Sequence, residues 1–193
     1  MEEIYLNKIE LTDKEKVADK EELLVVLDAD GKKTSFKEYR SVVHKNNLYH
    51  QEIGVIPMND KKQVLLQRRS KNKKSYPNCW ALCAGHVVND QTLIEAAVME
   101  ANEELGVNIS KSDLKLLVSQ TKNDREDNKC YATCFLYETK FNIDQFKKQN
   151  EEVEELKWFN IDEFEKMIEE EKNCIFKNND YYKTIIYNLK KLI

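Results

Sequence analysis

A chain of 193 residues with 41% hydrophobic residues is long enough for one well-filled core and too short for two ordinary domains. Its many charges nearly balance, to a net charge of -4, which argues against a protein that binds a nucleic-acid polymer. The acidic N-terminal segment MEEIYLNKIE and the shortness of every apolar run argue against export and membrane insertion, so we expect a cytoplasmic protein.

Five cysteines, an odd number, predict reduced thiols and no disulfide framework. Two pairs, Cys79/Cys83 and Cys130/Cys134, have a spacing that could suit zinc. Each pair falls in an expected strand region, partly among apolar neighbours. Packing as small hydrophobic side chains is therefore the favoured interpretation.

Strands dominate the expected elements of the N-terminal half, which follows an extension over residues 1–20. The single domain predicted over residues 21–193 begins with an apolar run and an Asp-Gly pair, typical of a strand and turn. A polar segment, 35–50, is interpreted as a connector and carries two of the three histidines. Residues 52–70 contain two apolar runs around Asn-Asp-Lys-Lys, which predicts a hairpin.

A basic loop over residues 71–80 and a short buried strand ending near residue 87 are expected next. Residues 92–105 then show the periodicity of a helix, because apolar residues recur three and four positions apart. They would form one apolar face: Leu93, Ile94, Ala97, Val98, Ala101 and Leu105.

The C-terminal part returns to strands before it closes with helices. Residues 113–141 predict two strands around a charged loop, Lys122 to Lys129. Residues 153–171 predict a strand and then a helix that Asp162 is expected to cap, and residues 181–193 an amphipathic helix. Strands and helices interleave, and the hairpins imply antiparallel pairs. The predicted class is α/β or α+β with a mixed sheet.

Three glutamates, Glu100, Glu103 and Glu104, stand at positions i, i+3 and i+4 of the expected helix, so their carboxylates project from one side. Like charges at this spacing repel by about 0.2–0.5 kcal/mol per pair. A bound cation would offset that repulsion, and oxygen ligands of this kind suit Mg²⁺ or Mn²⁺. Taken alone, the cluster favours the alternative of a solvated helix face.

The glycines around the cluster favour the metal site instead. From Gly85 to Val107 the sequence resembles the Nudix box, G-x5-E-x7-R-E-U-x-E-E-x-G-U, where U is aliphatic, and it fits without a gap. Two positions depart from the pattern: Gln91 replaces the first glutamate and Met99 replaces the arginine. The matched positions are Glu100, Ala101, Glu103, Glu104, Gly106 and Val107.

This resemblance implies the Nudix α/β/α sandwich and a metal-dependent hydrolase of a nucleoside diphosphate derivative or another organic diphosphate. It implies Mg²⁺ or Mn²⁺ on Glu100, Glu103 and Glu104, with Glu100 and Glu103 as catalytic residues. Met99 cannot pair with a glutamate, so the pKa of the carboxyl that an arginine would hold should rise and activity should weaken. The alternative is a degenerate domain that binds a nucleotide, a diphosphate or a protein without hydrolysis. Dimers are common in the family, so a homodimer is a further expectation.

The stretch from residue 65 to residue 87 also resembles isopentenyl-diphosphate isomerase, a Nudix-fold enzyme in which histidines bind metal. The histidines of that pattern are matched by His44, His50 and His86. The two proton-transfer residues of the isomerase are replaced by Ala84 and Asn128, which argues against isomerase chemistry. The Nudix hydrolases that are similar to the isomerase fit better, over most of the chain.

The basic loop is the remaining group with a chemical interpretation. Arginine binds phosphate oxygens with two donors and lysine neutralises their charge. Arg69 and Lys73 occupy positions that contact diphosphate in the isomerase pattern, so we expect them to bind a small-molecule diphosphate substrate. The histidines are counted as substrate-binding too, and a metal-binding or purely structural role for them stays open. Glu126, in the charged loop, is a further candidate metal ligand.

Overall fold

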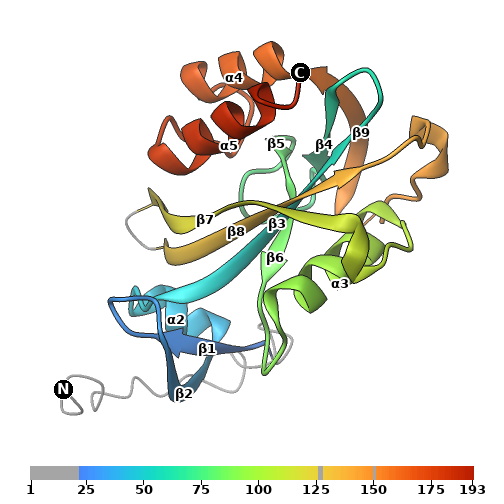
Figure 1. Cartoon of the computed structure of the whole chain (residues 1–193). Coiled ribbons are helices and arrows are strands. Elements are labelled where there is room, and N and C mark those ends of the chain that lie inside the picture. Colours follow the sequence, from blue (N-terminus) through green and yellow to red (C-terminus); the bar gives the residue numbers. More distant parts are fainter. Residues whose placement is uncertain (1–21, 126–127, 150) are drawn as a thin grey trace.

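The computed structural model describes residues 22–125, 128–149 and 151–193. A seven-stranded sheet forms its centre (Figure 1). Strands β3 and β8 run parallel, whereas the other strand pairs of this sheet are antiparallel, so the predicted mixed sheet is confirmed. The strands are β3 (His50–Met58), β4 (Gln63–Arg69), β5 (Trp80–Ala81), β6 (Cys83–His86), β7 (Leu114–Arg125), β8 (Asn128–Glu138) and β9 (Val153–Asn160).

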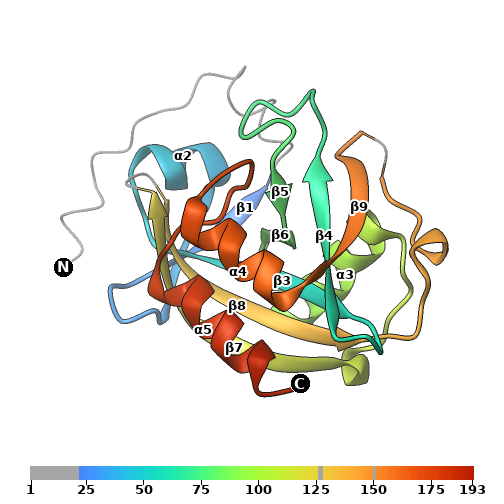
Figure 2. The same ribbon diagram turned by 90° about the horizontal axis from the view of Figure 1, so that it is seen from above.

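Helices cover both faces of this sheet (Figures 1 and 2). Helix α3 (Leu93–Leu105) packs against β3 and β6, while α4 (Ile161–Glu170) and α5 (Asp180–Lys190) pack against β4, β7 and β9. Successive side chains of a strand point to opposite faces. On β3, Ile53 and Val55 therefore join the core beneath α3, and Ile56 and Met58 join the core beneath α4 and α5. The described helices include none long and apolar enough to cross a membrane.

A second, two-stranded sheet precedes the main one. Its strands are β1 (Leu23–Leu27) and β2 (Lys33–Tyr39), and the short helix α2 (Arg40–Lys45) follows. The interpretation of residues 35–50 as a polar connector was therefore wrong. Strand β2 pairs with β1 alone and most of its residues are exposed or half-buried, so it has no apolar alternation to reveal it.

The predicted hairpin of residues 52–70 is present but splits almost at once. Strands β3 and β4 share one register pair, Met58 and Val64. Beyond that pair β3 continues beside β6 and β8, whereas β4 continues beside β5 and β9. The strands β5 and β6 thus lie between the two diverging arms, which brings the segment around Gly85 into the middle of the sheet.

Two local expectations need correction, and two lie outside the described residues. The charged loop predicted from Lys122 is largely strand, because β7 runs to Arg125 and Lys122 pairs with Cys130 across the ladder. Helix α4 is capped by Asn160, whose capping box includes Glu163; Asp162 lies inside the helix. Glu126 and the N-terminal extension, residues 1–20, fall outside the described part of the chain. The five cysteines are free thiols, as expected.

Candidate functional site

A cleft of about 400 Å³ is lined by most of the residues that the sequence predicts as site residues. Its walls come from α2, β4, β6 and α3 and from the basic loop that follows β4. His50 lies just behind it, buried against the other two histidines. The nominated residues that line the cleft are His44, Arg69, Lys73, His86, Glu100, Glu103 and Glu104.

Helix α3 presents the three glutamates because both of its ends are fixed. The Thr92 side chain accepts a hydrogen bond from the Glu95 amide, and the Glu95 carboxylate accepts one from the Thr92 amide, which satisfies two of the first-turn donors. Gly106 ends the helix in the left-handed region, at φ 63°. The helix spans the residues that the periodicity predicts.

Glu104 is the most enclosed of the three carboxylates, with 6% of the residue exposed. Its Oε2 accepts hydrogen bonds from Gln67 Nε2 at 2.8 Å and from the Ala84 amide at 3.0 Å. Burial raises the pKa of Glu104 to about 7, although these two hydrogen bonds work in the opposite direction. The carboxyl group is therefore fixed between β4, β6 and its own helix.

Glu100 lies directly over Gly85. A Cβ at residue 85 would collide with the Glu100 carboxylate, so only glycine leaves room for that side chain. Burial, and then the charges of Glu104 and Glu103, raise the pKa of Glu100 to about 8. The rise agrees in direction with the expectation drawn from Met99, but its causes are enclosure and neighbouring carboxylates. A divalent cation bound among these carboxylates would remove the repulsion.

The two departures from the box, Gln91 and Met99, touch each other. Gln91 Nε2 donates to Met99 Sδ at 3.3 Å, and Gln91 Oε1 accepts from the Val88 amide at 3.3 Å. Gln91 thus links the turn after β6 to helix α3 without any charge. From the sequence alone, Gln91 and Met99 were interpreted as two independent departures from the family pattern.

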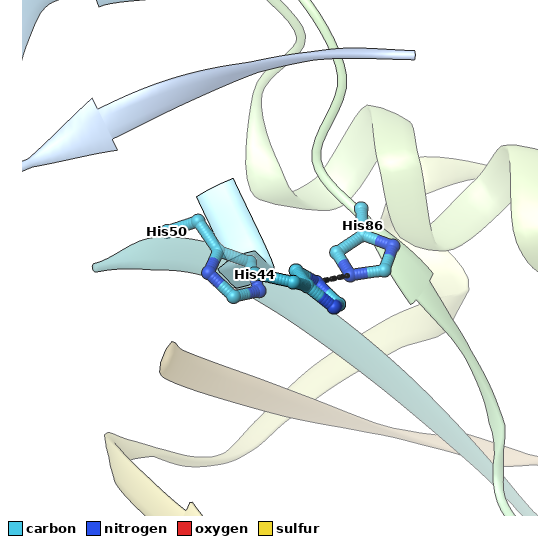
Figure 3. Close-up of side chains that lie close together, drawn as sticks. All are labelled: His44, His50 and His86. Carbon is cyan, nitrogen blue, oxygen red and sulfur yellow. Dashed lines mark hydrogen bonds between the residues drawn. The ribbon is translucent and has the colours of Figure 1, made fainter. Parts of the chain in front are cut away.

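The three histidines lie close together, and two of them, His44 and His86, line the cleft (Figure 3). One ring nitrogen from each of His44, His50 and His86 lies within 4.8 Å of the others, and no other group of described residues meets this criterion for a metal site. His50 is 1% exposed, and its Nδ1 lies 3.1 Å from the Leu48 carbonyl, to which it donates. His50 Nε2 is buried, forms no hydrogen bond and lies 3.7 Å from Glu52 Oε1. With Nδ1 held by a carbonyl, Nε2 of a neutral His50 would carry the lone pair with which histidine binds metal.

Glu52 and Lys122 lie beside the histidines and were missed from the sequence. Glu52 follows His50 by two residues on β3, on the same side of the strand, and is paired in register with His86. Lys122 Nζ lies 2.8 Å from Glu52 Oε2. Burial raises the pKa of Glu52, but Lys122, His50 and His86 outweigh it and hold that pKa well below its usual range. The two-residue spacing from His50 was the signal that could have found Glu52.

The basic end of the cleft is formed by the predicted phosphate-binding residues. Arg69 donates from Nε and Nη2 to the Ser75 carbonyl, at 3.2 and 3.0 Å, which holds the basic loop closed on itself. Lys73 Nζ lies 2.7 Å from Glu152 Oε1. Glu152 lines the same cleft, so the lysine is paired with a carboxylate inside it.

The positions that carry proton transfer in the isomerase pattern hold groups unsuited to it. Ala84 lines the cleft, while Cys83 points to the opposite side and is buried in the core beneath α3. Asn128 donates to Glu52 Oε1 at 3.1 Å. Neither Ala84 nor Asn128 can supply an acid or a base.

Comparison with known proteins finds a matching family model and similar proteins. The family model described as NUDIX domain matches residues 48–178. Nudix hydrolase 3 of Arabidopsis thaliana is 33% identical over 149 residues, which cover 72% of this chain and 19% of that protein. An isopentenyl-diphosphate Delta-isomerase of Mycolicibacterium vanbaalenii is 33% identical over 93 residues, 48% of this chain and 51% of the isomerase. The chain thus spans about a fifth of the first relative and about half of the second.

Solved structures share the fold at low sequence identity. DR0079 from Deinococcus radiodurans has a TM-score of 0.64 at 17% identity, and the match covers 79% of this chain and 92% of that one. The NUDIX domain of Shewanella oneidensis NrtR, solved with ADP ribose, has a TM-score of 0.57 at 15% identity and covers 95% and 100%. These matches establish the three-layer arrangement of helices and sheet as the fold of that family.

Proposed function

This chain belongs to the Nudix family, and from that membership we propose that it is a Mg²⁺- or Mn²⁺-dependent hydrolase of a nucleoside diphosphate derivative or another organic diphosphate. One observation carries the proposal. A single cleft is lined by the three glutamates of α3, by the basic residues Arg69 and Lys73, and by His44 and His86. A diphosphate at its centre would meet carboxylates for a cation and cations for its own oxygens.

In this proposal Glu103 and Glu104 hold the cation from the same face of α3. Glu103 is exposed at the cleft, and Glu104 is fixed by Gln67 and the Ala84 amide. When bound, the cation neutralises charge on the diphosphate and on the phosphorus centre as water attacks. Lys73 exchanges Glu152 for a phosphate oxygen, and Arg69 keeps the loop that carries Lys73 in place.

Glu100 is the proposed general base. The attacking water forms a bond to phosphorus, its proton passes to the Glu100 carboxylate, and the bond from phosphorus to the bridging oxygen breaks. Without a cation, burial and the neighbouring carboxylates raise the pKa of Glu100 to about 8; a bound cation would lower it toward the working pH, where a base works best. Its position over Gly85 keeps the carboxylate inside the cleft.

The test is release of phosphate or monophosphate from a panel of diphosphates with Mg²⁺ and with Mn²⁺. ADP-ribose heads the panel because the similar Shewanella oneidensis domain was solved with it. Glu103→Gln should abolish release. Glu169→Gln, an exposed glutamate on α4, is the matched control and should retain it. Release that survives Glu103→Gln unchanged would contradict the assignment of the glutamates.

A second candidate, a domain that binds a diphosphate without cleaving it, is favoured by the contact between Gln91 and Met99. That contact keeps the turn and helix joined but lacks the charges of the family pattern. Calorimetry separates the two candidates. Metal-dependent binding of ADP-ribose without any release of product supports the binder, and turnover supports the hydrolase.

A further inference from the structure

Gln67 is a buried polar residue whose side-chain amide donates two hydrogen bonds. It lies on β4 with 3% of the residue exposed, among the apolar neighbours Leu65 and Leu66. Its Nε2 donates to the Leu82 carbonyl at 3.0 Å and to Glu104 Oε2 at 2.8 Å. The first bond fixes the orientation of the amide, and the second reaches the enclosed carboxylate of α3.

These bonds link three elements at one point. Gln67 comes from β4, Leu82 and Ala84 from the segment that enters β6, and Glu104 from α3. The Ala84 amide donates to the same Oε2 that Gln67 contacts, so two donors hold this oxygen of the carboxyl group in place. A buried hydrogen bond to an ionised acceptor is roughly twice as strong as a neutral one.

We propose that Gln67 is a positioning residue, which holds the Glu104 carboxylate in the orientation that binds the divalent cation. The inference rests on the proposed function, in which Glu104 is a ligand of that cation. Gln67 itself is absent from the cleft wall and touches neither cation nor substrate, so it acts through Glu104. The simpler alternative is that Gln67 only fills the core, in which case an apolar side chain of the same length would serve equally well.

Mn²⁺ binding to the intact chain, followed by the electron paramagnetic resonance signal of the free ion, tests the proposal without any substrate. Gln67→Met keeps the length of the side chain and removes both donors. We expect it to weaken Mn²⁺ binding at the carboxylate site by about 10- to 100-fold, the usual effect of losing a partner behind a metal ligand. The Mn²⁺ binding that Glu104→Gln removes is the part that belongs to the carboxylate site.

Gln63→Met is the matched control, because Gln63 lies on the same strand and bonds Asn160 at the end of β9. It should leave Mn²⁺ affinity unchanged. Should Gln67→Met fail to fold, Gln67→Asn replaces it, since asparagine keeps an amide but is one methylene too short to span the distance to Glu104. The same weakening is expected.

A double-mutant comparison separates positioning from a general structural role. In the Glu104→Gln background, Gln67→Met should cause no further loss of Mn²⁺ affinity. An equal loss in both backgrounds would overturn the proposal, and so would wild-type affinity in Gln67→Met while Glu104→Gln has lost it. If Glu104→Gln itself binds Mn²⁺ like the wild type, Glu104 is no ligand, and the proposed function fails together with the inference.

Discussion

Gln91 and Met99 are best understood as one change at two positions. Each departs from the family pattern, yet the amide of one donates to the sulfur of the other. A glutamate introduced at position 91 alone would lack a cation at position 99, and an arginine introduced at position 99 alone would lack a carboxylate at position 91. The effect of either residue therefore depends on the other.

This coupling predicts that Met99→Arg alone brings no gain in activity. Gln91→Glu alone should destabilise the chain, and the double variant Gln91→Glu/Met99→Arg should recover the loss through a coupling energy of about 1 kcal/mol. Chemical denaturation of the four proteins measures it. Strictly additive changes in the free energy of unfolding would contradict the coupling.

The raised pKa values of Glu100 and Glu104, about 8 and about 7, predict how the metal-free protein responds to pH. Between the ordinary value of 4.5 and about 8, the folded chain holds protons that the unfolded chain has released, so stability falls as pH rises. Below pH 6.5 His86 opposes this trend, because burial lowers its pKa and the unfolded chain then binds the extra proton. The thermal midpoint measured with a chelator should therefore fall from pH 6.5 to 8.

Glu100→Gln should flatten that dependence, because glutamine does not titrate. Saturating Mg²⁺ should also reduce it, since the cation replaces the protons. A midpoint that rises between pH 6.5 and 8 in the chelated wild type would contradict the assigned shifts.

At the scale of elements, the site depends on how closely β6 and α3 approach. Gly85 on β6 leaves the space that Glu100 of α3 occupies. Gly85→Ala should displace the carboxylate, and a misplacement of about 1 Å can lower activity by about 100-fold. Hydrolysis and metal affinity, measured beside the unfolding midpoint, check this expectation.

Gly54→Ala provides the comparison for Gly85→Ala. A Cβ at Gly54 would meet Cys134 Sγ and a Leu82 methyl at 3.6 Å, which is ordinary contact. Activity should therefore survive that substitution. Equal activity in the two alanine variants would show that the space beside Glu100 is not needed.

Helix α3 was predicted because its signal is local, and its caps, which were not predicted, are local too. A helical period, a capping threonine and a terminal glycine all act within a few residues. Strand β2, helix α2 and the end of β7 were not predicted, because their polar sequences carry no apolar period. The cap of α4 at Asn160 was misplaced by two residues.

At the scale of the whole molecule, the cleft offers two chemically different sets of metal donors. The glutamates supply oxygen, which Mg²⁺ prefers, and the histidines supply neutral nitrogen, which borderline ions such as Co²⁺ prefer. Co²⁺ should therefore give a visible spectrum that His86→Ala removes and Glu103→Gln retains. Mg²⁺ binding, measured by calorimetry, should instead be lost in Glu103→Gln and retained in His86→Ala. A Co²⁺ spectrum that His86→Ala leaves unchanged would contradict the existence of two separate sets of donors.

The sequence by itself determined the family, the helix with its three glutamates, and the residue types at both ends of the cleft. Each of these features follows from the spacing of residues within one segment of the chain, and the sequence contains that spacing in full. Only the tertiary structure decided that Gln91 contacts Met99, that Glu52 and Lys122 join the histidines, and that Gln67 holds Glu104. Each of these is a contact across separate elements. It depends on strand register and helix packing, and no local pattern encodes those.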